Sequence, residues 1–134
     1  MTSCYLDASA IVKLATAEAE SLALRAWLRE RFPVVTSRIS TVEVARAIGR
    51  KDGGGVARGR AAALEAFTSV ALAELDAGIA NRAAEIGPAT LGALDAIHLA
   101  TALAIGDELA AFVTYDVRLA DAARAAGLTV VTPA

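Results

Sequence analysis

Short apolar runs alternate with longer amphipathic stretches along this chain. Five runs have the apolar or β-branched character of strands, and they span 4–6, 34–36, 70–75, 111–114 and 128–131. The stretches between them carry apolar residues at helical spacing, over 10–14, 18–31, 40–51, 56–67, 76–86, 92–105 and 117–126. Strands that alternate with helices predict an α/β fold with a parallel sheet and right-handed crossovers.

The first strand ends in an acid. Cys4, Tyr5 and Leu6 form an apolar run that suits a strand buried on both faces, and Asp7 follows directly. In parallel α/β sheets, ligands bind just beyond the carboxyl ends of the strands. Asp is also an ordinary helix cap, so Asp7 by itself leaves both interpretations open.

Composition favours one domain over residues 1–134. The chain is 56% apolar and only 4% aromatic, so its core must consist of Ala, Leu, Val and Ile. The formal net charge of −2 excludes a global basic field, so a polyanionic partner would need a local basic patch or a bound cation. Cys4 is the single cysteine and is expected in the core, in a structural role and not as a nucleophile.

The expected location is the cytoplasm, with no membrane partner. Residues 1–3 carry neither the basic region nor the apolar region of a signal peptide. The most apolar helix, over 94–105, is interrupted by Asp95 and His98, and no apolar run approaches the roughly 20 residues of a membrane span.

Two further acids are expected at the same edge of the sheet as Asp7. Asp116 follows the fourth strand, so it also lies at a carboxyl end, and neighbouring first and fourth strands would place both acids at a topological switch point. Glu43 lies in the first turn of the helix after the second strand. The local sequence favours another role for Glu43, because Ser40-Thr41-Val42-Glu43 has the pattern of a capping box.

Asp95 is harder to explain as a structural residue. Its helix is apolar nearly all round, which predicts burial, and the neighbouring sequence offers no Arg or Lys. An unpaired buried carboxylate costs several kcal/mol, at order of magnitude, and a bound cation would remove that cost. His98 stands one turn further on. It could join Asp95 as a ligand, but a neutral His bonded to backbone is the favoured interpretation.

These residues carry a family resemblance. The stretches 5–10, 40–43, 94–100 and 113–116 occur in the order found in the PIN domain, and the chain resembles a VapC-type toxin of a bacterial toxin–antitoxin pair. The resemblance implies a three-layer α/β/α fold with strand order 3-2-1-4-5. It also implies a Mg²⁺- or Mn²⁺-dependent ribonuclease, inhibited by a VapB-type antitoxin and assembled as a homodimer. The run Gly53-Gly54-Gly55 looks looser than in a typical member.

The resemblance also assigns site residues. The acidic quartet and its polar neighbours match Asp7, Glu43, Asp95 and Asp116, with Ser9 and Thr114. Asp7 and Asp95 are expected as primary cation ligands, and Asp116 would complete the shell. Glu43 would orient or deprotonate the attacking water. Asp121 falls on the helix after the site, and we expect it on a solvated face.

A local basic run could hold RNA. Five of the 13 basic residues lie within fifteen positions: Arg46, Arg50, Lys51, Arg58 and Arg60. They could track phosphates, although a solvated helix pair without a partner explains them equally well. With so few aromatic residues, base stacking is a weak recognition device here.

Three other functions compete with that of a ribonuclease. A receiver domain would want an acid after the third strand, which Asp76 could supply, and a Lys after the fifth, but no Lys lies beyond Lys51. A haloacid-dehalogenase phosphatase would want a second Asp where Ser9 stands. A catalytically silent PIN-like module that binds RNA or a partner is the main alternative, but it would tolerate a broken quartet, and this quartet is intact.

Overall fold

The computed structural model of the protein describes residues 2–29, 33–51 and 53–134. One sheet of five parallel strands has the order β3-β2-β1-β4-β5. This confirms the predicted parallel sheet and the order that the resemblance implied. The strands are β1 (Ser3–Leu6), β2 (Val34–Ser37), β3 (Val70–Ala73), β4 (Leu109–Val113) and β5 (Val130–Val131).

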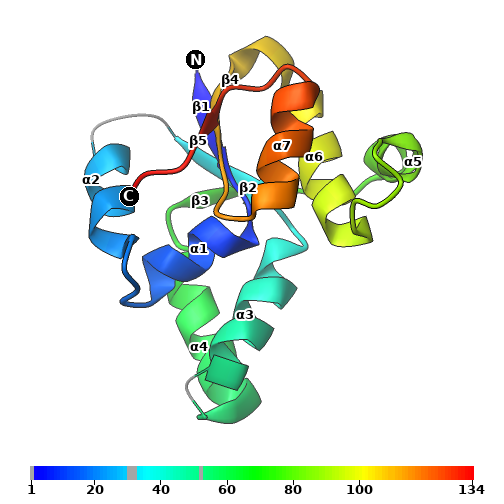
Figure 1. Cartoon of the computed structure of the whole chain (residues 1–134). Helices are drawn as coiled ribbons and strands as arrows, with labels where there is room; N and C mark the ends of the chain where they lie inside the picture. Colours follow the sequence, from blue (N-terminus) through cyan, green and yellow to red (C-terminus); the bar gives the residue numbers. More distant parts are fainter. Residues whose placement is uncertain (1, 30–32, 52) are drawn as a thin grey trace.

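Seven α-helices within the described ranges cover both faces of the sheet (Figure 1). They are α1 (Ala8–Ala15), α2 (Ser21–Leu28), α3 (Ser40–Lys51), α4 (Gly55–Ala66), α5 (Ala77–Glu85), α6 (Ala93–Ile105) and α7 (Val117–Ala125), with a turn of 3-10 helix, η1 (Gly106–Glu108), before β4. Helices α1 to α4 contribute to the core on one face, and α6 and α7 to the core on the other. The architecture is therefore the expected α/β/α arrangement.

The central strand β1 divides its side chains between the two cores. Cys4 and Leu6 face the core shared with α1 to α4, whereas Tyr5 points into the core shared with α6 and α7. All three side chains are fully buried, as the apolar run predicted. Burial raises the pKa of the Cys4 thiol to about 11, which fits the expected structural role.

Helices α3 and α4 form an arm that projects from the carboxyl end of the sheet (Figure 1). Two glycines allow the helices to approach closely. A Cβ atom on Gly59 would lie 2.0 Å from the carbonyl oxygen of Ala45, and one on Gly49 would lie 2.9 Å from that of Gly55. Backbone therefore packs against backbone in this arm, and side chains are pushed to its edges.

The structure differs from the predicted elements chiefly at α2. The helix begins at Ser21 and not at residue 18, because the Ser21 hydroxyl accepts from the Glu18 N–H and donates to the Thr16 carbonyl, which fixes a turn. Leu22, an apolar residue near the start of this helix, is 79% exposed. The predicted end of this helix at 31 lies outside the described residues. The ends of the strands differ from prediction by at most two residues. None of the helices in the described part of the chain combines the length and hydrophobicity of a membrane span.

Candidate active site at the carboxyl edge of the sheet

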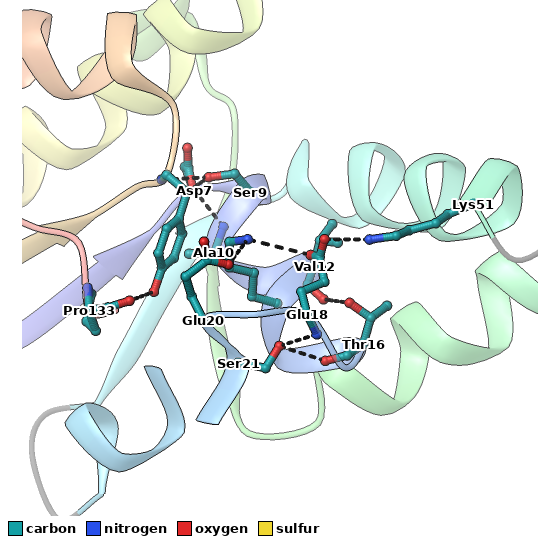
Figure 2. A network of polar contacts seen from close by, with 12 residues as sticks. Asp7, Ser9, Ala10, Val12, Thr16, Glu18, Glu20, Ser21, Lys51 and Pro133 are labelled. Carbon is teal, nitrogen blue, oxygen red and sulfur yellow. Dashed lines mark hydrogen bonds and ion pairs between the residues drawn. The ribbon is translucent and has the colours of Figure 1, made fainter. Parts of the chain in front are cut away.

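Asp7 is fixed between β1 and β4 by two hydroxyl groups. Thr114 Oγ1 donates to Asp7 Oδ2 at 2.5 Å, and Ser9 Oγ donates to Oδ1 at 2.6 Å. The Ala10 N–H also donates to Oδ1, at 3.0 Å, so Asp7 does cap α1. Figure 2 shows Asp7 with Ser9 and Ala10 at the start of the helix. The two interpretations of Asp7 are therefore compatible, because one carboxylate both caps a helix and lies at the strand edge.

Burial raises the pKa of the Asp7 carboxyl above its ordinary value, and the three hydrogen bonds to the carboxylate oppose the rise. Asp7 is only 3% exposed. Repulsion from the other acids is not among the leading causes for this residue. Desolvation dominates, because the side chain lies inside the fold and not on the surface of a cleft.

The same hydroxyl groups join Asp7 to the loop that carries Asp116. Thr114 Oγ1 accepts from the Asp116 N–H at 3.1 Å, and Ser9 Oγ accepts from the Tyr115 N–H at 3.0 Å. Asp116 caps α7 by accepting from the Leu119 N–H at 3.0 Å. The strand ends of β1 and β4 thus hold two acids side by side through a shared set of polar contacts.

Asp95 lies in the first turn of α6 and faces the other acids. Burial raises the pKa of its carboxyl, the nearby Asp116 raises it further, and Asp7 and Glu43 add smaller contributions that His98 opposes. The four acids therefore lie within electrostatic reach of one another. Asp95 is half-buried and not fully buried as predicted, since its helix exposes one side near its start.

Glu43 and His98 are bonded to each other, which overturns two expectations. His98 Nε2 and Glu43 Oε1 are 2.7 Å apart, so the Glu43 side chain reaches α6 and not the amide of Ser40. The Ser40 hydroxyl lies 2.6 Å from that of Thr36, so the predicted capping box is wrong. His98 is buried and bonded to side chains and not to backbone, because Tyr5 OH lies 2.6 Å from its Nδ1.

The donor set suits a hard divalent cation. Carboxylate oxygens supported by hydroxyl groups are the ligands that Mg²⁺ and Mn²⁺ prefer. Among the described His, Cys, Asp and Glu side chains, no group of three stands close enough to hold one ion directly. Both oxygens of Asp7 already accept hydrogen bonds. The arrangement fits a cation that keeps several of its waters, as Mg²⁺ usually does.

The basic run is divided by the fold. Lys51 forms an ion pair with Glu18 across to the loop before α2, as Figure 2 shows. Arg46, Arg50 and Arg60 instead line a groove of about 620 Å³ on the arm. Arg58 is exposed on α4 and is not part of that lining. The predicted set is therefore not one patch, and the groove is where three of its members meet.

The groove also has an apolar lining. Val42, Val56 and Leu64 line it, and each is more than 60% exposed to solvent. Asp121, in contrast, lies on the exposed face of α7 beside Arg124, where the sequence placed it.

The PIN domain family model matches residues 4–125, and the chain belongs to that family. Ribonuclease VapC46 of Mycobacterium tuberculosis is 44% identical over 99% of both chains, and Ribonuclease VapC47 of the same species is 39% identical over 96% of both. The chain is thus a VapC-type member of the PIN family, which confirms the resemblance read from its motifs.

Two solved structures share the fold. The crystal structure of VapC20 from M. tuberculosis, described as a toxin that cleaves the sarcin–ricin loop, superposes with a TM-score of 0.74 at 20% identity, covering 98% of this chain and 100% of that one. A toxin–antitoxin complex from Klebsiella pneumoniae superposes with a TM-score of 0.67 at 25% identity, covering 98% of both.

Proposed function

We propose that this chain is a divalent-metal-dependent endoribonuclease and the toxin of a VapBC-type pair. The observation that carries the proposal is the gathering of four acids at one edge of the sheet: Thr114 joins Asp7 to the loop of Asp116, and Asp95 lies within electrostatic reach of Asp116, Asp7 and Glu43. These acids come from four elements far apart in the sequence. A fold has little structural reason to gather like charges at a strand edge, whereas a cation site requires it. The ribonuclease names of relatives at 44% and 39% identity support the reaction class.

Each side chain has a distinct part in the proposed hydrolysis. Asp7 and Asp95 would hold Mg²⁺ or Mn²⁺, with Asp116 completing the set and some contacts running through water. Bound there, the cation would lower the pKa of a water molecule and offset charge on the phosphate. Ser9 and Thr114 keep the Asp7 carboxylate in one orientation through their short hydrogen bonds.

Glu43 would orient the attacking water and take its proton. The water oxygen then bonds to phosphorus while the bond from phosphorus to the leaving ribose oxygen breaks, and that oxygen takes up a proton from solvent. Glu43 is suited to this role because only its Oε1 is bonded to His98, and the side chain is 23% exposed.

A cleavage assay tests the reaction. Purified protein should cut RNA in Mg²⁺ or Mn²⁺, lose activity in chelator, and arrest growth when expressed in cells. Asp95→Asn should abolish cleavage and arrest, and Asp121→Asn is the matched control because that acid lies exposed on α7. Undiminished activity of a folded Asp95→Asn protein would contradict the site. RNA binding without cleavage by the wild type would instead support a silent binding module.

We further propose that the groove on the arm binds a VapB-type antitoxin. The apolar lining suits a protein segment more than it suits a phosphate backbone, and a relative of known structure is a toxin–antitoxin complex. Val42→Glu or Leu64→Glu should weaken capture of a coexpressed VapB-type protein and leave kcat for RNA cleavage unchanged. Val117→Glu is the control, because Val117 is 74% exposed but lies outside the groove. Equal loss in all three variants would argue against the groove.

A further inference from the structure

A chain of three hydrogen bonds runs from the backbone of β2 to the Glu43 carboxylate. The Ser37 N–H donates to Tyr5 OH at 3.1 Å, Tyr5 OH lies 2.6 Å from His98 Nδ1, and His98 Nε2 lies 2.7 Å from Glu43 Oε1. Tyr5 is completely buried and His98 is 1% exposed. Neither side chain belongs to the acidic quartet, and neither reaches the site as a ligand or base.

The donors along this chain place a hydrogen on Nε2 whichever way the middle hydrogen bond runs. The Tyr5 oxygen accepts from the Ser37 N–H, and with its second lone pair and its own hydrogen it can accept from His98 Nδ1 or donate to it. Nε2 carries a hydrogen both in the neutral ring that accepts at Nδ1 and in the doubly protonated ring. That N–H faces a carboxylate oxygen, which accepts hydrogen bonds when ionised.

Packing holds the chain in place. The Tyr5 ring stacks on Phe112, with centroids 5.3 Å apart and planes 3° apart, and it meets His98 edge-on at 5.8 Å. Ser37 is at the end of β2, so the first donor is anchored in the sheet itself. A buried side chain that is locked in one rotamer fixes the position of the next group to which it is hydrogen-bonded.

We infer that His98 is a positioning residue. It is held in place by Tyr5, which is bonded to β2, and its hydrogen bond to Glu43 fixes the position of the Glu43 carboxylate. Glu43 needs such a support because it belongs to the projecting arm, whereas Asp7, Asp95 and Asp116 belong to elements packed on the sheet. The inference rests on the proposed part of Glu43 in hydrolysis.

The first test is structural and needs neither metal nor RNA. His98 is the only histidine in the chain, so two-bond ¹H–¹⁵N correlation spectra of labelled metal-free protein report one ring without overlap. We expect a hydrogen on Nε2 in the wild type. A neutral ring with its hydrogen on Nδ1 alone would overturn the inference, because Nε2 could not then donate to Glu43.

The second test uses two substitutions of different reach. In His98→Gln the side-chain amide reaches the place of Nε2 and can still donate to Glu43, whereas in His98→Asn it ends near the place of Nδ1. With a fluorogenic RNA oligonucleotide, kcat should fall on the order of 10²-fold in His98→Asn, the loss that a misplacement of about 1 Å can cause. His98→Gln should keep more of kcat, and KM should stay nearly constant in both.

Tyr5→Phe removes the hydroxyl group and keeps the ring, so kcat should fall there too. Thr101→Val is the matched control, because it removes a buried hydroxyl group from the same helix, one bonded to the Ile97 carbonyl and not to the site. Equal kcat losses in the Gln and Asn variants, or a loss confined to KM, would overturn the inference. An inactive wild type would count against the proposed function alone, and the spectra would still decide the hydrogen-bond chain.

Discussion

The carboxylate site and the α3–α4 arm begin at the same edge of the sheet but are held in different ways. At the site, side chains are fixed by polar contacts: Asp7 accepts three hydrogen bonds, and Asp116 and Glu43 each accept one. Within the described residues, no buried side-chain nitrogen or oxygen lacks a partner. In the arm, Gly49 and Gly59 let two backbones touch, and apolar and basic side chains face solvent.

The difference assigns separate tasks to the two regions. A polar network that is fully satisfied has few alternative arrangements, which suits groups that must meet a reacting phosphate within a fraction of an ångström. A groove of exposed side chains adapts to a partner, and substitutions there should weaken binding. Glu43 links the two regions, because it belongs to the arm by sequence and to the site by its hydrogen bond.

Substitution of Glu43 should give the largest effect. Glu43→Gln keeps an oxygen that can accept from His98, so the fold should survive, but it removes the charge that takes a proton from water. We expect kcat to fall roughly 10²- to 10⁴-fold, the usual contribution of general base catalysis. Glu65→Gln, exposed on α4, is the control. Full activity of Glu43→Gln in the RNA assay would leave the residue a purely structural role.

Gly59→Ala should break the arm without touching the site. The added Cβ would meet the Ala45 carbonyl oxygen at 2.0 Å, so the two helices must separate, and overpacking of this kind costs about 1–3 kcal/mol. Thermal melts measure the loss. Gly78→Ala serves as control, because its Cβ would have its nearest contact at an ordinary 3.4 Å. A Gly59→Ala protein that melts as the wild type does would refute the close approach.

Replacement of Arg46 and Arg50 with Gln should act on affinity. Both residues follow Glu43 on α3 at spacings of three and seven, so they extend along one helix face away from the site. KM for RNA should rise and the salt dependence of binding should flatten, by about 0.7 in logarithmic slope for each phosphate that the variant no longer neutralises. Arg82→Gln on α5 controls for general charge. A change in kcat alone would place one of these arginines at the transition state instead.

Much of the site follows from sequence because strand ends are easy to recognise. Asp7 follows an apolar strand directly, Asp116 comes three residues after the end of another, and parallel strands bring their carboxyl ends together whatever the details. The bond between Glu43 and His98 could not be predicted in the same way, since it joins residues 55 positions apart on different helices. Local sequence favoured the capping box, and tertiary contact overrode it.

One signal for the buried chain was present in the sequence and was missed. Tyr5 lies in a strand predicted to be buried on both faces, and a buried tyrosine hydroxyl normally finds a hydrogen-bond partner. The polar side chains expected inside that could supply such a partner were Asp95 and His98, and the structure shows that it is His98. The exposed start of α6 was not predictable, because an apolar composition does not reveal which side of a helix the neighbouring elements leave uncovered.

The smallest effect concerns the stability of the metal-free protein. Asp95 has a folded pKa above its ordinary value, so the native state binds more protons than the unfolded state in that range. This contribution is favourable below the unfolded pKa and is lost as pH rises through the folded one. Asp95→Asn should therefore raise the melting temperature slightly near neutral pH. As pH rises from mildly acidic values, the melting temperature of the variant should also fall less than that of the wild type.

Asp7→Asn should not show the same gain. Asp7 accepts hydrogen bonds on both oxygens. In Asp7→Asn the side-chain NH2 group would replace one of these oxygens and face another hydrogen-bond donor, so one hydrogen bond would be lost. Melts of both variants in chelator, from acidic to neutral pH, make the comparison. A loss of stability in Asp95→Asn at neutral pH would mean that its carboxylate is stabilised and not strained by its surroundings.

The bond between Thr114 and Asp7 also has a consequence for synthesis of the protein. The two residues are 107 positions apart, and β1 lies in the centre of the sheet beside β4, which is made much later. At about 5–20 residues per second, roughly 5–20 s pass between translation of the first acid and of the loop that completes its surroundings. A growing chain would carry no assembled site during that time, so a ribosome that makes the proposed ribonuclease is not exposed to it while the chain is still short.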